Sequence, residues 1–164
     1  MIESDQVDVV IESPRGSRNK YEFDEERGVM RLDRRIVGAV TFPADYGFVP
    51  GTVGEDGEPL DALVLLDEPT YPGIWVVARV VGVSWIGTRT GREAKLLCVP
   101  VGDPAYEDVH DLPDLPRHVV QEIGQFFDVY KQLDDGTTTT DEGQDGRDVA
   151  IRVLAEARTR YPGT

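Results

Sequence analysis

Three carboxylates stand within six residues at Asp56, Glu58 and Asp61, and the apolar residues 62–66 follow them directly. Mg²⁺ prefers hard oxygen ligands and retained waters, so a few carboxylates on a rigid element suit it. Gly57 permits a tight turn between the acids. The segment therefore indicates either a magnesium site anchored on a buried strand or a solvated turn that opens such a strand.

A cluster of cations precedes the acidic segment. Arg15, Arg18 and Lys20 stand between Glu12 and Glu22. Further arginines follow at Arg31, Arg34 and Arg35. A chain that gathers carboxylates for a metal and cations for an anion has the parts for phosphoryl chemistry, where catalysis is mostly positioning and charge stabilisation. Solvated charges on hairpin faces explain each cluster singly but do not explain them jointly.

The composition fits one domain and a small anionic ligand. At 164 residues and 40% hydrophobic content, the chain is long enough for a single domain, 1–164, and too short for two of ordinary size. Its formal charge of −14 repels nucleic acid and anionic membranes, so we interpret the cationic cluster as a small-anion pocket. The longest apolar run, 74–83, contains Arg79 and is too short to span a membrane. A single cysteine, Cys98, forms no internal disulfide, which favours the reducing cytoplasm.

The sequence predicts strands first and helices last. Residues of high strand propensity, bounded by Gly, Pro and acidic turns, predict strands at 7–11, 21–23, 29–32, 63–66, 75–85 and 95–99. These strands indicate a closed or partly closed antiparallel barrel. Apolar residues three to four positions apart predict a helix from Pro116 to Tyr130 and another over 147–161. We expect the polar stretch 134–146 to be a flexible connection.

Six ordered landmarks extend over most of the chain. They are the segment ending in Lys-Tyr-Glu (12–22), Arg34, the Tyr-Gly-Phe segment (42–48), the acidic segment (56–61), the lysine strand with its Asp-Pro turn (95–104), and the segment ending in Tyr-Lys (126–131). In this order they resemble the soluble family I inorganic pyrophosphatases of bacterial type. The resemblance implies an α+β fold, in which helices pack outside a five-stranded antiparallel barrel like the oligonucleotide-binding fold. It also implies Mg²⁺-dependent hydrolysis of pyrophosphate to two phosphates and, because bacterial members are commonly hexamers, a homohexamer.

The resemblance assigns roles to individual residues. Glu12, Asp56, Asp61 and Glu93 match metal ligands. Glu58 matches the acid commonly taken as the general base, and Glu93 belongs with it to the expected catalytic set. The residues expected to hold the two phosphoryl groups are Lys20, Arg34, Tyr46, Lys95, Tyr130 and Lys131.

Three positions depart from the family pattern, because the chain has Glu58, Thr88 and Glu93 where the resemblance implies Asp. The extra methylene of Glu58 moves its carboxylate by about 1.5 Å, and displacement on this scale costs on the order of 100-fold in rate. Thr88 removes one formal charge from a metal position, and our hypothesis is that Arg89 or Arg92 takes the place of that metal.

The substitutions leave an alternative function open, a degenerate homologue with weak or no activity that binds a phosphate compound. An oligonucleotide-binding module is disfavoured, because such modules need a cationic groove with exposed stacking aromatics and this chain is acidic.

Overall fold

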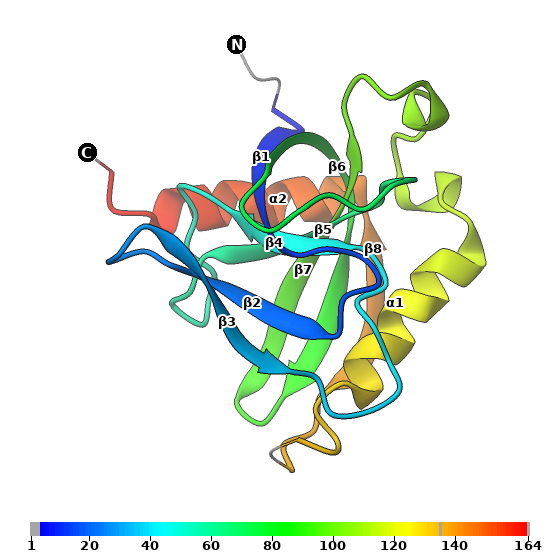
Figure 1. Cartoon of the computed structure of the whole chain (residues 1–164). Coiled ribbons are helices and arrows are strands. Elements are labelled where there is room, and N and C mark those ends of the chain that lie inside the picture. The colour runs from blue at the N-terminus through cyan, green and yellow to red at the C-terminus, as the bar shows by residue number, and fades with distance from the viewer. Residues whose placement is uncertain (1–3, 135, 164) are drawn as a thin grey trace.

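The strands form where β-branched and aliphatic residues are concentrated in the sequence. The computed structural model describes residues 4–134 and 136–163 (Figure 1). Its strands are β1 (Gln6–Ser13), β2 (Asn19–Asp24), β3 (Val29–Arg35), β4 (Asp45–Val49), β5 (Leu60–Val64), β6 (Trp75–Thr88), β7 (Gly91–Pro100) and β8 (Thr140–Gly146). Its helices are α1 (Arg117–Val129) and α2 (Arg147–Arg160), and the short 3₁₀ helices η1 (Pro104–Tyr106) and η2 (Leu112–Asp114) precede α1. Within the described ranges, no helix is both long and apolar enough to cross a membrane.

Five strands close into a ring. They pair in the order β1-β4-β5-β7-β6, and β1 also pairs with β6. The expected α+β fold with a five-stranded barrel is thereby confirmed, with one departure from antiparallel pairing: β5 and β7 are parallel. Five strands in a closed ring cannot all alternate in direction, and because the other four pairings are antiparallel, the pairing of β5 with β7 has to be parallel. The separate hairpin of β2 and β3 projects from the ring (Figure 1).

The two helices lie against different parts of the barrel (Figure 1). From α2, Ala150 and Leu154 join a core cluster that contains Ala62 of β5 and Leu96 of β7. From α1, Ile123 and Phe127 join a second core cluster. This cluster contains Leu63 and Leu97, the residues that directly follow Ala62 and Leu96 in β5 and β7. Consecutive residues of a strand point to opposite faces, so β5 and β7 are buried on both faces and form a rigid support. Cys98 lies buried in the first cluster, as its position in an apolar strand indicates.

Two elements differ from the sequence-based expectation. The prediction of a flexible connection over 134–146 is wrong for Thr140–Gly146, which forms β8 along the edge of β6. An edge strand needs backbone pairing and little apolar burial, so this polar sequence carries no alternating pattern. The strand β4 was not predicted either, because it is short and contains a glycine. A side chain at Gly47 would overlap the Val10 carbonyl oxygen of β1, so the pairing of these strands requires glycine.

Candidate active site

One large pocket gathers almost all of the predicted site residues. Its volume is about 590 Å³, and its lining comes from the barrel, from the β2–β3 hairpin and from the end of α1. The predicted residues that line it are Glu12, Lys20, Tyr46, Asp56, Glu58, Asp61, Glu93, Lys95, Tyr130 and Lys131. Of the predicted site residues that the structure describes, only Arg34 lies outside this lining.

Strand register brings the central residues together. Asp61 of β5 is paired with Lys95 of the parallel strand β7, although the two are 34 residues apart in sequence. Tyr46 of β4 is paired with Ser13, next to Glu12 at the end of β1. The rigid strands therefore fix the positions of these side chains, whereas Asp56 and Glu58 come from the turn that precedes β5.

Lys95 lines the pocket and is only 4% exposed. Its ammonium group donates hydrogen bonds to Asp61 Oδ2 at 2.7 Å, to the Tyr46 hydroxyl at 2.9 Å and to Glu93 Oε2 at 3.4 Å. Burial opposes the charge on Lys95, but the Asp61 carboxylate and the two strong hydrogen bonds raise its pKa above the ordinary value. Burial, followed by the negative charge of Asp61, raises the pKa of Tyr46. Lys95 is therefore a charged ammonium group with a neutral tyrosine beside it.

Glu12 is the carboxyl group whose protonation is most altered by its surroundings. Its pKa is raised to about 7, chiefly by burial and in part by the negative charges of Asp61 and Glu22. A hydrogen bond of 2.9 Å from the Phe23 backbone N–H to Glu12 Oε2 opposes the rise. A divalent cation beside Glu12 would replace the hydration that this carboxylate has lost.

The turn that carries Asp56 and Glu58 is held by its own backbone and by α2. The Glu58 N–H donates to Asp56 Oδ1 at 3.0 Å, and Gly57 has a φ of 85°, which favours glycine. At the start of the turn, the Val53 N–H donates to the Ala157 carbonyl of α2 at 2.9 Å. The fold thus connects the C-terminal turn of α2 to the acidic segment.

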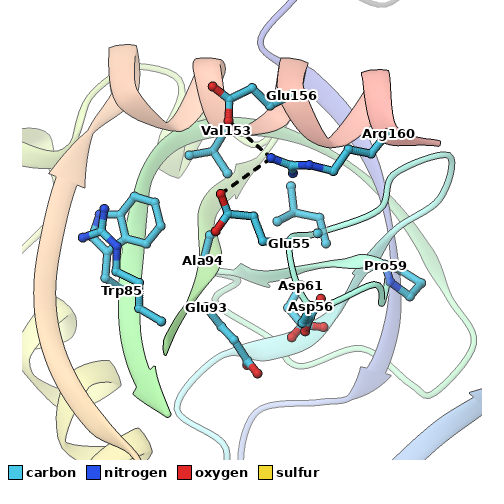
Figure 2. A pocket seen from close by; sticks show the side chains of 13 residues that line it. Glu55, Asp56, Pro59, Asp61, Trp85, Glu93, Ala94, Val153, Glu156 and Arg160 are labelled. Carbon is cyan, nitrogen blue, oxygen red and sulfur yellow. Dashed lines mark ion pairs between the residues drawn. The ribbon is translucent and has the colours of Figure 1, made fainter. Parts of the chain in front are cut away.

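A smaller cavity of about 60 Å³ separates this turn from α2 (Figure 2). Figure 2 shows Arg160 of α2 between Glu55 and Glu156, at 3.7 and 3.6 Å. The cavity shares part of its lining with the large pocket, namely Asp56, Pro59, Asp61 and Glu93. The two ion pairs of Arg160 involve exposed side chains, so they contribute little stability.

Arg34 and the two positions of the loop hypothesis, Thr88 and Arg92, are not part of the lining of the large pocket. Arg34 forms ion pairs with Asp134, in the segment after α1, and with Asp33, the latter at 3.6 Å from Arg34 Nε. Thr88 ends β6, and its hydroxyl donates to the Gly91 carbonyl at 3.1 Å. Arg92 lines the smaller cavity, where its guanidinium carbon is 3.9 Å from the centre of the Trp85 ring. In this structure Arg92 therefore stacks on an aromatic ring on the α2 side of Glu93.

Sequence reasoning missed the acids at the rim of the pocket. Asp24, Glu25 and Glu26 of the β2–β3 hairpin line it, together with Glu22, which the sequence already placed beside the cationic cluster. The only sequence signal was their number, which is equally typical of a solvated turn. Among the residues that the structure describes, the lining contains nine carboxyl groups and three lysines. A polyanionic substrate in such a pocket requires additional cations.

The residues present fit a hard divalent cation. In the described part of the chain, no three acidic, histidine or cysteine side chains are grouped closely enough to hold an ion as they stand. The available donors are nevertheless carboxylate oxygens, which Mg²⁺ prefers. The carboxyl groups of the lining outnumber its lysines, so the pocket has room for added positive charge. Glu12 in addition is a buried carboxyl group that a cation would stabilise in its ionised form.

An α+β barrel with a pocket of carboxylates around buried and half-buried lysines defines a site for cations together with a small anion. The sequence matches the family model of inorganic pyrophosphatase over residues 9–162. The inorganic pyrophosphatase of Streptomyces coelicolor is 47% identical over 152 residues, which are 93% of this chain and 90% of that protein. That of Methanosarcina acetivorans is 43% identical over 161 residues, covering 98% of this chain and 95% of its own length.

Solved structures agree with the sequence relatives. An inorganic pyrophosphatase from Thermus thermophilus superposes with a TM-score of 0.93 at 41% identity, covering 97% of this chain and 92% of that one. One from Helicobacter pylori superposes with a TM-score of 0.95 at 40% identity, covering 99% and 97%. The chain belongs to the inorganic pyrophosphatase family, which confirms the resemblance found in its sequence.

Proposed function

We propose that this protein hydrolyses inorganic pyrophosphate to two phosphates and that the reaction depends on Mg²⁺. The observation that carries the proposal is the pocket, which nine carboxyl groups and three lysines line together. The chain is also 40–47% identical to proteins named inorganic pyrophosphatase. The names of these relatives support an active hydrolase over the degenerate phosphate-binding homologue. No specific contact in the pocket favours that alternative.

In the proposed site, Glu12, Asp56, Asp61 and Glu93 would hold the metal. When bound, Mg²⁺ polarises phosphoryl oxygens and lowers the pKa of a coordinated water. Glu58 accepts the proton of the attacking water at its carboxylate, with Glu93 nearby in the same pocket.

The phosphoryl oxygens are bound by cations and hydroxyl groups. These groups belong to Lys20, Arg34, Tyr46, Lys95, Tyr130 and Lys131. Lys20 is 3.7 Å from Glu22 and 3.6 Å from Asp33, so a phosphoryl group must compete with these carboxylates for it. Arg34 must likewise leave Asp134 to reach the pocket.

The test is phosphate release from pyrophosphate by the purified protein, with Mg²⁺ and with Mg²⁺ removed by a chelator. We expect release that requires both the protein and the metal. A Glu58→Gln variant, which keeps the size of the side chain but cannot accept the proton, should lose most of the activity while unfolding at the same temperature. Binding of pyrophosphate without release would instead support the degenerate homologue.

We further propose that the protein is cytoplasmic and assembles into a homohexamer. The family membership supports both statements, and the single buried cysteine is suited to a reducing compartment. Light scattering after size-exclusion chromatography measures the assembly directly. A mass near that of the 18.2 kDa chain would contradict the hexamer.

A further inference from the structure

Lys95 is bonded to the carboxylates that the proposed function assigns to the metal. All three N–H donors of its ammonium group are used, and its partners include Asp61 at 2.7 Å and Glu93 at 3.4 Å. By contrast, Lys131 contacts the ring of Tyr130 at 5.3 Å and forms no ion pair within the described ranges. Lys95 is thus the lysine of this pocket that is already neutralised by two predicted metal ligands.

A metal ion and this ammonium group compete for the same oxygens. Lys95 occupies one lone pair on Asp61 Oδ2 and one on Glu93 Oε2, and its positive charge repels a cation that coordinates these two carboxylates. The third partner, the Tyr46 hydroxyl at 2.9 Å, is not a predicted metal ligand and remains available to the ammonium group. The side chain can therefore move away from the carboxylates without losing every partner.

We propose that Lys95 is an internal counter-ion, which Mg²⁺ displaces from Asp61 and Glu93, and which thereby becomes free to bind a phosphoryl group. This inference rests on the proposed function, because it uses the assignment of those two acids to the metal. In the metal-free protein, Lys95 neutralises the two carboxylates. Its contact with substrate follows from metal binding.

The first experiment measures Mg²⁺ binding to Lys95→Met by calorimetry, without substrate. Methionine keeps the length of the side chain and removes the charge. If Lys95 competes with the metal, the variant should bind Mg²⁺ about tenfold more tightly, the scale of one charge-assisted hydrogen bond. A purely structural lysine gives the opposite result, since disordered carboxylates bind metal more weakly. Unchanged or weaker binding would overturn the proposal.

The matched control is Lys131→Met. It removes the same charge from the same pocket, but from a lysine bonded to neither Asp61 nor Glu93. We expect its Mg²⁺ affinity to change less than threefold, which is well below the change at Lys95. An equal gain in both variants would assign the effect to the overall charge of the pocket and would overturn the proposal.

A second measurement uses the unmodified protein and does not depend on the folding of a variant. Nuclear magnetic resonance of the lysine ammonium groups follows Lys95 directly, because burial slows exchange of its protons with water. Its resonance should shift along the same isotherm as Mg²⁺ binding. A resonance that stays in place at saturating Mg²⁺ overturns the displacement.

The two hypotheses fail in different ways. If the unmodified protein binds no Mg²⁺, the metal assignment and this inference are both wrong. If it releases phosphate only with Mg²⁺ but Lys95→Met binds the metal no more tightly, the proposed function stands and only this inference is wrong.

Discussion

Glu12→Gln is expected to stabilise the metal-free protein at pH 8 and to change its stability much less at pH 5. The pKa of Glu12 is raised from 4.5 to about 7 in the folded protein, chiefly by burial. The folded state therefore binds this proton more tightly than the unfolded state, and stability falls as pH rises from about 4.5 towards 7. Ionisation of Glu12 lowers the free energy of unfolding by at most about 3 kcal/mol, and about 2 kcal/mol of this loss develops between pH 5 and pH 8.

Denaturant unfolding of both proteins at these two pH values, in the presence of a chelator, measures the difference. Glu26→Gln is the matched control, because it removes an exposed carboxylate from the rim of the same pocket. It should change stability by less than about 0.5 kcal/mol at either pH. An equal gain from both variants, or a Glu12→Gln gain that does not grow between pH 5 and pH 8, would refute the reasoning.

Three further outcomes are expected. Asp61→Asn, which keeps size and removes charge, should weaken Mg²⁺ binding in calorimetry and abolish most hydrolysis; an unchanged titration would contradict its role. Lys20→Ala and Lys131→Ala should each weaken pyrophosphate binding about 10- to 100-fold, the loss of one charge-assisted contact, whereas Arg158→Ala, on the exposed end of α2, should not. Thr88→Asp should add one bound Mg²⁺ in the presence of a pyrophosphate analogue. The reason is that Thr88 pairs with Gly91, which is two residues from Glu93 and on the same face of the hairpin. An unchanged number of bound Mg²⁺ ions would show that the site does not need a carboxylate at position 88.

The acidic segment and the barrel were predictable because each depends on local pattern. Asp56, Glu58 and Asp61 are close in sequence and directly precede an apolar strand, so their convergence follows from chain geometry. The contact between Asp61 and Lys95 could not be derived in this way, because it depends on the parallel register of β5 and β7. Pairing between distant strands is set by the whole fold and has no local signal.

The ion pairs of Arg34 and the strand β8 illustrate the same limit. Arg34 is bound by Asp134 from the segment after α1, a contact between residues 100 positions apart in the numbering. The sequence indicates a cation at position 34 but not the partner that holds it. β8 is similar, since its polar residues pair through their backbone, and its Asp145 accepts a hydrogen bond from the Trp85 indole at 2.8 Å.

The substitutions in the proposed metal site alter its geometry more than its charge. The loss of one Asp at Thr88 is small beside the excess of carboxyl groups over lysines that remains in the pocket. The extra methylene of Glu58 and of Glu93 shifts each carboxylate by about 1.5 Å, which positions both the proposed proton acceptor and a proposed metal ligand differently. The longer side chain of Glu93 accepts a hydrogen bond from Lys95 at 3.4 Å. Because Lys95 also donates to Asp61, its ammonium group bridges the two carboxylates. We therefore expect the metal affinity of the proposed site to depend on how easily Lys95 leaves these two acids, in addition to the charge of the pocket.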